Sequence, residues 1–409
     1  MIESLDIHTI WILLVGLVII LSGLIEASCQ KLRVPSLVGY LLLGMALSLM
    51  DSYWAFFNEP ILNTFSFLAD LGVIALLFKV GLQSHPGALA RKLPTALKIW
   101  IGDVCGSALL GFGTAFYILQ LPLIPSLIIA TALTATSVGV SVAAWQSQHA
   151  LNSTNGQILL DVAELDDISA IALMALLFAL LPTLHQGQSD MLSTLSTVGT
   201  GFIARFILFL GLCYFFSRYL EPRVTAFTNR LEPEPQRMLT VIGVGFIIAA
   251  FANWLGFSLA IGALFAGLVF SRDPKAVKTE KSFQDLYAFV TPFFFVNIGL
   301  HVTPEYVMTG AGLGTVLMLA AALGKFIGAG TPALLTSGVT GALLIGVSMI
   351  PRAEIAMIVV HQGQGLGDWA MPDQVYAGMV FVTLTTCIGG PWILYRLLQR
   401  WPQSVGHKL

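Results

Sequence analysis

Two adjacent aspartates, Asp166 and Asp167, lie in the middle of a long apolar stretch. Successive helix positions point about 100° apart, so the two carboxylates cannot share one partner. One can face an ion cavity while the other faces a neighbouring helix. Two carboxylates this close repel when both are ionised, which favours a proton on one of them. We therefore expect a proton- and cation-binding pair, with Glu164 one turn from Asp167 on the access path to the cavity.

A second chemical signal is Lys325, which also lies inside an apolar stretch between Gly324 and Gly328. The flanking glycines allow another helix to come close. A lysine at the middle of a membrane span needs a carboxylate partner or must lose its proton. Asp166 is the expected partner, and a purely structural salt bridge is the alternative. Asp103, also within an apolar stretch, either lines a cytoplasmic funnel or makes a local polar contact.

Two apolar stretches are interrupted by polar or helix-breaking residues, Thr134-Ala-Thr-Ser137 and Ser348-Met-Ile-Pro-Arg-Ala-Glu354. Unwinding at Thr134, Thr136 and Ser137 would free carbonyls and hydroxyls to support a cation site. Alternatively, these hydroxyls bond the preceding helical turn. Arg352 and Glu354 are expected to compensate the dipoles of the half-helices, which is a structural role rather than ion binding.

The elements that must position these residues are membrane helices. The chain has 409 residues, 56% of them hydrophobic and 10% charged, whereas a soluble domain has roughly 25% charged residues. The uniformly apolar stretches recur along the chain, and most can cross a bilayer core of about 30 Å, which predicts an all-α bundle rather than a barrel. No basic block suggests nucleic-acid binding. The four cysteines are far apart in apolar segments, so we expect free thiols rather than disulfides or metal ligands. No cofactor is expected apart from the transported Na⁺ and H⁺.

Hydropathy predicts about thirteen spans. Their approximate limits are 8–25, 34–50, 61–82, 95–119, 123–146, 158–182, 196–217, 238–253, 255–271, 286–301, 311–336, 339–362 and 375–396. Lysines and arginines gather in loops that follow odd-numbered spans, for example at Lys275 and Lys278. The positive-inside rule makes these loops cytoplasmic. The prediction is a multi-pass inner-membrane protein with its N-terminus outside and its C-terminus inside.

Thirteen spans divide into six, a linker span and six, which gives two halves of opposite orientation. This is the arrangement of an inverted-repeat transporter. The first repeat is expected over residues 1–195, a linker helix and cytoplasmic loop over 196–237, and the second repeat over 238–409. The interrupted fifth and twelfth spans hold equivalent places in the two halves. Paired broken helices indicate a substrate site.

Several stretches together resemble one family in content and in order. They are Leu76-Leu-Phe-Lys-Val-Gly-Leu82, Thr134-Ala-Thr-Ser137, Asp166-Asp167, Gly262-Ala-Leu-Phe-Ala-Gly267, Pro292-Phe-Phe-Phe-Val296, Ala322-Leu-Gly-Lys325 and Pro351-Arg-Ala-Glu354. The ordered set covers essentially the whole chain. It is similar to the second family of monovalent cation:proton antiporters, the NapA- and KefC-like proteins.

The resemblance implies crossed broken helices, a homodimer and a mobile core that moves like an elevator. It implies that Asp167 binds the cation and carries a proton, while Asp166 pairs with Lys325. KefC-like potassium members usually have Gln-Asp in place of Asp-Asp, so the pair favours electrogenic Na⁺/H⁺ exchange over K⁺/H⁺ exchange. Two positions depart from the family pattern: Lys79 is inserted in the third-span motif, and Asn253 replaces an acid.

Other functional classes fit the sequence less well. Gly365-Leu-Gly-Asp368 matches the Gly-x-Gly-Asp string of intramembrane aspartyl proteases. It falls in an expected outside loop, however, and the other aspartates are adjacent on one helix. The prediction is therefore a transporter and not an enzyme. A passive cation channel or sensor is a third possibility, and cation selectivity is open because cavity size and ligand number decide it.

Overall fold

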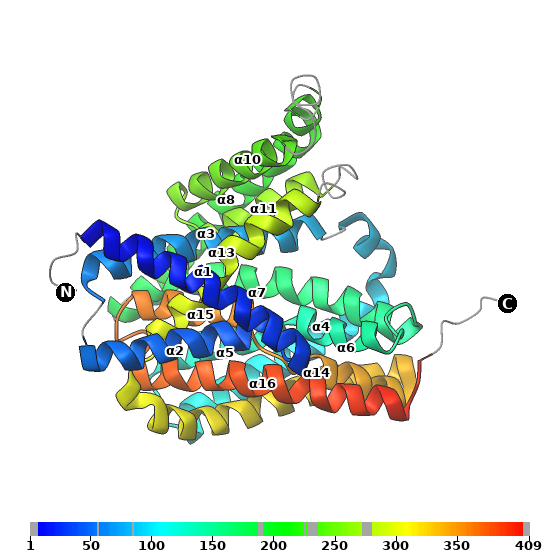
Figure 1. The fold of residues 1–409 in the computed structure, drawn as a ribbon. Helices are drawn as coiled ribbons and strands as arrows, with labels where there is room; N and C mark the ends of the chain where they lie inside the picture. The colour runs from blue at the N-terminus through cyan, green and yellow to red at the C-terminus, as the bar shows by residue number, and fades with distance from the viewer. Residues whose placement is uncertain are drawn as a thin grey trace. The chain divides into compact units, whose positions relative to one another are not determined.

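The computed structural model describes residues 7–54, 57–83, 86–186, 191–224, 226, 236–271 and 280–403. Figure 1 shows that these residues form helices joined by short connections, and they contain no strand. The α-helices are α1 (Ile7–Leu32), α2 (Ser36–Trp54), α3 (Glu59–Gln83), α4 (Pro86–Gly113), α5 (Leu123–Thr134), α6 (Val138–Ser147), α7 (Thr154–Gln186), α8 (Met191–Phe215), α10 (Gln236–Trp254), α11 (Leu259–Phe270), α13 (Glu280–Leu300), α14 (Val307–Ser348), α15 (Glu354–Gly365) and α16 (Asp373–Arg400). Short π- or 3₁₀-helical turns are η1 (Thr114–Ile118), η2 (Phe216–Leu220) and η3 (Pro304–Tyr306).

The helices have the length and composition of membrane spans. Among the described residues, ten helical segments are long and apolar enough to cross a bilayer, and two shorter apolar helices cover Thr240–Trp254 and Leu259–Phe270. Backbone groups in lipid must be bonded within their own segment, which is why an apolar chain of this kind is helical. The all-helical membrane fold is thus confirmed, while the count of thirteen spans and the inverted-repeat topology stay predictions. The basic loop with Lys275 and Lys278 lies outside the described residues, so the orientation also stays a prediction.

The predicted spans 311–336 and 339–362 are arranged differently from two simple helices. Helical structure continues as α14 through Ser348, with one non-helical residue at Gly338, where φ is 65°. A positive φ is readily adopted by glycine, so the chain changes direction there without a longer loop. The second segment then breaks over residues 349–353 and resumes as α15.

The chain divides into two compact units. The first comprises Met1–Gln83, Phe216–Phe251 and Gly262–Pro304. Within it, α13 packs against both α2 and α3. Small residues allow this contact: a Cβ on Gly44 would lie 2.1 Å from the carbonyl oxygen of Val296. Each unit contains segments from several parts of the chain, so the units differ from the expected repeats, which divide at residues 195 and 237. The repeats concern symmetry within the sequence, and that division stays a prediction.

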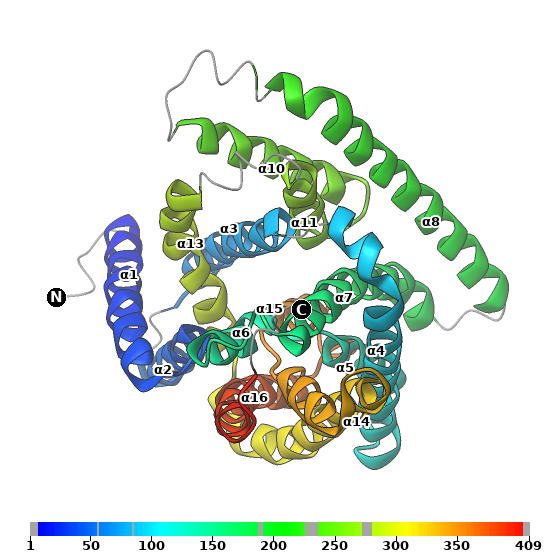
Figure 2. The ribbon, with the colours of Figure 1, turned by 90° about the vertical axis from the view of Figure 1, so that its right-hand side faces the viewer.

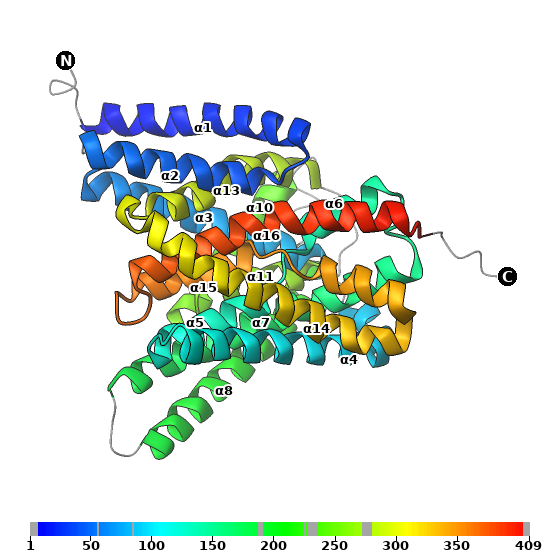
Figure 3. The ribbon, with the colours of Figure 1, turned by 90° about the horizontal axis from the view of Figure 1, so that it is seen from below.

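The second unit comprises Ser84–Phe215, Ala252–Ile261 and Glu305–Leu409. In it, α14 makes its largest contacts with α4 and α16. Figure 2 shows α14 between α4 and α16, and Figure 3 shows α4 and α14 running side by side. Every residue singled out as chemically important belongs to this unit.

Candidate functional site

The two predicted helix breaks contact each other. One separates α5 from α6 at residues 135–137, and the other separates α14 from α15 at residues 349–353. The backbone N–H of Ser137 donates to the carbonyl of Pro351 at 2.9 Å. Ser141 donates to the carbonyl of Ser348 at 2.6 Å, and the Trp145 indole donates to the Ser348 hydroxyl at 2.9 Å. Four half-helices therefore end or begin around one point.

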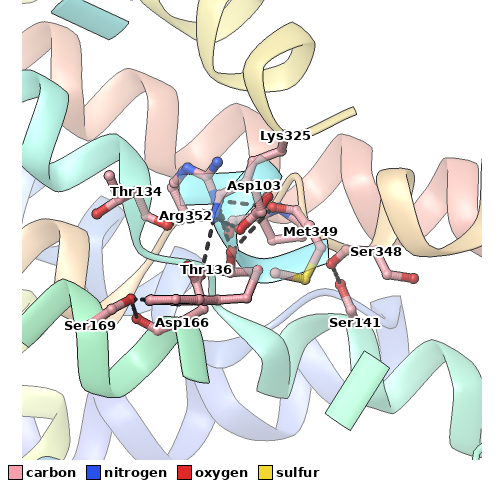
Figure 4. A network of polar contacts seen from close by, with 12 residues as sticks. Asp103, Thr134, Thr136, Ser141, Asp166, Ser169, Lys325, Ser348, Met349 and Arg352 are labelled. Carbon is pink, nitrogen blue, oxygen red and sulfur yellow. Dashed lines mark hydrogen bonds and ion pairs between the residues drawn. The ribbon is translucent and has the colours of Figure 1, made fainter. Parts of the chain in front are cut away.

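Lys325 lies beside this crossing and is completely buried. Its ammonium group donates to Asp166 Oδ2 at 3.0 Å, which places the expected pair together. It also donates to Asp103 Oδ2 and to the carbonyl oxygen of Thr134. Figure 4 shows these groups converging from α4, α5, α7 and α14. Lys325 thus bridges two buried carboxylates and the end of a half-helix.

Of the two expectations for Asp103, a cytoplasmic funnel or a polar contact, the structure shows a polar contact. The Asp103 side chain is fully buried and in contact with Lys325. Close packing of two helices explains this position. A Cβ on Gly328 would lie 2.6 Å from the Gly102 carbonyl oxygen, and one on Gly106 would lie 2.9 Å from the Gly328 Cα. The backbones of α4 and α14 approach at glycines, so Asp103 meets Lys325 directly.

Asp167 occupies a different environment from Asp166. Asp166 is fully buried, whereas Asp167 is partly exposed. Among the described residues, no hydrogen bond or ion pair joins the Asp167 carboxylate. The charges that act on it most strongly belong to Asp166, Glu354, Lys325 and Glu164. The two aspartates therefore face different surroundings, as their helical spacing predicts.

Charged side chains lie at the ends of the half-helices. The Lys325 ammonium contacts the last carbonyl of α5, and Arg352 Nη1 donates to the Met349 carbonyl after α14 at 3.0 Å. Both groups are cations at carbonyl ends, where the helix dipole is negative. Glu354 begins α15 and accepts a hydrogen bond from Ser137, the N-cap residue of α6, at 2.6 Å. A carboxylate thus lies by two positive helix N-termini. Dipole compensation by Arg352 and Glu354 requires this placement. Lys325 also lies at the carbonyl end of a half-helix, and the sequence analysis did not predict that contact.

The three hydroxyls of the first break already have partners. Thr134 donates to the carbonyl of Thr131 within its own helix at 2.7 Å. Thr136 accepts from Arg352 Nη1 at 3.4 Å, and Ser137 donates to Glu354. The described residues contain no group of three or more His, Cys, Asp or Glu side chains suited to a metal ion.

The two departures from the family pattern lie outside this network. Lys79 on α3 places its ammonium 4.1 Å from the centre of the Tyr287 ring on α13, a cation–π contact within the first unit. Asn253 is exposed near the end of α10, and its carbonyl accepts from the Gly256 N–H at 2.9 Å.

The comparison with known proteins decides the family. The model of the sodium/hydrogen exchanger transmembrane family matches residues 16–400. The chain belongs to this family. The high-affinity Na⁺/H⁺ antiporter NhaS3 of Synechocystis is 31% identical over 366 residues, which cover 88% of this chain and 77% of that protein. A Na⁺/H⁺ antiporter of Enterococcus hirae is 26% identical over 369 residues, covering 89% of this chain and 92% of that one.

Solved structures agree on the fold. The sodium proton antiporter MjNhaP1 of Methanocaldococcus jannaschii superposes with a TM-score of 0.66 at 17% identity, covering 96% of this chain and 97% of that one. The resemblance to cation:proton antiporters is thus confirmed. This sodium/hydrogen exchanger family member is a multi-pass membrane protein whose matched relatives are transporters rather than enzymes.

Proposed function

We propose that the chain is an electrogenic Na⁺/H⁺ antiporter of the inner membrane. The observation that carries this proposal is the pairing of two unlike carboxylates. Asp167 is partly exposed and without a hydrogen-bond or ion-pair partner among the described residues, while its neighbour Asp166 is buried against the Lys325 ammonium at 3.0 Å. Asp167 can exchange a proton for a cation, and the adjacent Asp166–Lys325 pair responds to the resulting change in charge.

In the proposed cycle, Asp167 carries one proton inward and exchanges it for Na⁺. The cation replaces a proton on the same oxygens, so the two occupants exclude each other. Thr134, Thr136 and Ser137 lie at the neighbouring helix break, and their oxygens retain lone pairs that can support the ion. Glu164 is among the charges that act on Asp167, and we propose that it lines the approach to the site.

A second proton leaves from the group formed by Asp166 and Lys325. When Na⁺ binds beside Asp166, the cation takes over part of the role of the ammonium, so the Lys325–Asp166 pair weakens and one proton is released. Two positive charges then leave the site for each one that enters. The membrane potential drives such exchange because one net charge is worth about 2.3 kcal/mol per 100 mV.

The location of the site supports an elevator mechanism. Asp103, Asp166, Asp167, Lys325 and Arg352 come from three separate helices and a helix break, yet all belong to one compact unit. A site contained in a single unit can be carried across the bilayer without being taken apart. We further propose a homodimer, with the N-terminus outside and the C-terminus in the cytoplasm.

Exchange in proteoliposomes tests this function. The purified protein is expected to release protons in response to Na⁺ or Li⁺ gradients, and K⁺ is measured in parallel because K⁺/H⁺ exchange is the competing activity. Asp285→Asn, which removes an exposed carboxylate on α13, is the control for the chemical change. Cation current without proton flux would contradict antiport, and exchange of K⁺ in preference to Na⁺ would contradict the assigned cation.

A further inference from the structure

The Lys325 ammonium contacts two carboxyl groups, whereas a simple ion pair has one. Asp103 on α4 and Asp166 on α7 both contact it, and all three side chains are fully buried. Asp166 alone would balance the lysine charge. Burying a second carboxylate is unfavourable unless that group has a compensating charge or holds a proton. The protonation of Asp103 is therefore tied to the state of the Lys325–Asp166 contact.

The sequence around Asp103 mirrors the sequence around Lys325. Gly102-Asp-Val-Cys-Gly106 and Gly324-Lys-Phe-Ile-Gly328 share the pattern glycine, charged residue, two others, glycine. Their backbones are in contact, since a Cβ on Gly102 would lie 2.5 Å from the Gly328 carbonyl oxygen. The two segments also fall in the fourth and eleventh predicted spans, which are equivalent places in the predicted repeats. Asp103 therefore occupies the place that corresponds to Lys325.

Carboxyl groups around Lys325 outnumber the cationic side chains, so some of them can hold protons. Arg352 is fully buried and acts electrostatically on Asp103 and Asp166, so it and Lys325 could balance these two carboxylates. Asp167 and Glu354 add two further carboxyl groups within electrostatic reach. Glu164 also acts on Asp167, so five carboxyl groups share this region with two cationic side chains. The excess of carboxyl groups can be balanced by protons or by Na⁺.

Each of the two buried carboxyls has one oxygen that could carry a proton. One oxygen of each, Oδ2, contacts Lys325. The other, Oδ1, is buried without a hydrogen-bond partner among the described residues in both Asp103 and Asp166. Asp166 adjoins the cation-binding Asp167 on α7, whereas Asp103 contacts the ammonium from another helix, α4. Asp103 is thus the carboxyl that can change its charge without adjoining the cation.

We propose that Asp103 holds the second exchanged proton and that Lys325 is an ammonium in both the proton-loaded and the Na⁺-loaded state. This inference rests on the proposed function and refines it: the proton that leaves through Asp166 and Lys325 comes from Asp103. In the proton-loaded state, Asp103 and Asp167 are protonated and the ammonium pairs with the Asp166 carboxylate. In the Na⁺-loaded state, both protons have left and the ammonium pairs with the Asp103 carboxylate. The Na⁺ held by Asp167 then compensates Asp166.

The bridging ammonium supplies a route for a proton from a fully buried group. Lys325 transfers a proton from Nζ to Asp166, breaking an N–H bond and forming an O–H bond. Asp103 transfers its proton to Nζ, which restores the ammonium and leaves Asp103 ionised. Asp166 then releases its proton toward the partly exposed Asp167 side of α7. One proton has left, and the proton count of the lysine is unchanged.

The decisive experiment is the charge stoichiometry of Asp103→Asn. The variant protein is purified, shown to be folded by its thermal unfolding, and reconstituted beside the parent and Asp285→Asn. We expect Na⁺-driven proton flux to persist, while the current per transported Na⁺ falls to background. The Asp285→Asn control is expected to stay as electrogenic as the parent. A folded Asp103→Asn protein with the parent's current per Na⁺ would overturn the proposal.

A second variant and a spectroscopic readout keep the inference testable if the asparagine variant fails to fold. Asp103→Glu retains a carboxyl and is expected to remain electrogenic; electroneutral exchange by this folded variant would refute the proposal.

Infrared difference spectra of the purified parent, with and without Na⁺, are expected to lose the carbonyl stretch of two protonated carboxyls. One component should move in Asp103→Glu, and an unmoved spectrum would also overturn the inference. Because this measurement needs no transport, failure of Na⁺/H⁺ exchange in the parent would refute the proposed function separately.

Discussion

Replacement of Lys325 with glutamine is the perturbation with the most direct consequence for transport. The side chain loses its charge, and two buried carboxyls lose their shared cation, with Asp166 at 3.0 Å from it in the parent. Leaving an ionised partner behind in a buried pair costs about 3–5 kcal/mol. Binding a proton avoids this cost, so we expect Asp166 and Asp103 to remain protonated through the cycle. Asp167 alone then exchanges its proton for Na⁺, and transport becomes electroneutral.

The size of the expected effect follows from the charge moved. In the parent, one net charge in a potential of about 100 mV is worth about 2.3 kcal/mol, which changes the equilibrium Na⁺ ratio about fifty-fold. In Lys325→Gln, the same potential should not change that ratio. The assay imposes a potassium diffusion potential on proteoliposomes and finds the Na⁺ ratio at which proton flux reverses. Currents on a supported membrane give an independent measure.

A matched control separates the loss of this lysine from the loss of a lysine in general. Lys79→Gln removes a membrane-span lysine that contacts Tyr287 in the other unit, and it is expected to keep the fifty-fold response. If Lys325 is only structural, the folded fraction of Lys325→Gln will fall while its stoichiometry stays that of the parent. A folded, active Lys325→Gln protein that still responds to the potential about fifty-fold would refute the reasoning.

Three further predictions concern the ion ligand, the helix contact and the orientation. Asp167→Asn should abolish Na⁺/H⁺ exchange with an unchanged unfolding temperature, and substantial exchange by it would remove Asp167 from the ion site. Gly328→Ala should destabilise the protein by about 1–3 kcal/mol in thermal unfolding, because its Cβ would lie 2.6 Å from the Gly102 carbonyl oxygen. Gly312→Ala on the same helix has nothing within 4 Å and should unfold like the parent; equal unfolding temperatures for the two variants would contradict the contact. A cysteine at Lys278 should react only with reagents added from the cytoplasmic side, and labelling from outside would reverse the orientation.

The sequence predicted the helix breaks and the principal charged pair because each produces a local signal. A polar or proline-containing interruption of an apolar run is visible without knowing what lies opposite, as at Thr134–Ser137 and Pro351. Asp166 and Lys325 were paired correctly, although 159 residues separate them, since each is costly in lipid without an opposite charge. The flanking glycines of Lys325 likewise predicted a close helix without identifying it as α4.

The role of Asp103 could not be obtained in this way. Its environment depends on which helix lies against α4, and 222 residues separate it from Lys325. Hydropathy gives the spans but not their neighbours, so an aspartate within a predicted span fits a funnel as well as an ion pair. The signal that could have identified the contact is the shared glycine pattern around Asp103 and Lys325, compared across the two predicted halves.

The long sequence separation within the charge cluster also bears on how the protein is made. Asp103, Asp166 and Asp167 are synthesised well before Lys325 and Arg352. The lysine follows Asp166 by 159 residues, which at 5–20 residues per second corresponds to a delay on the order of 10–30 s. During this interval, the early helices carry their acids without the cations that later neutralise them. Protonation of these side chains, shielding at the insertion machinery or incomplete insertion of α4 and α7 would each avoid the cost of their charges in lipid until α14 brings Lys325 to them.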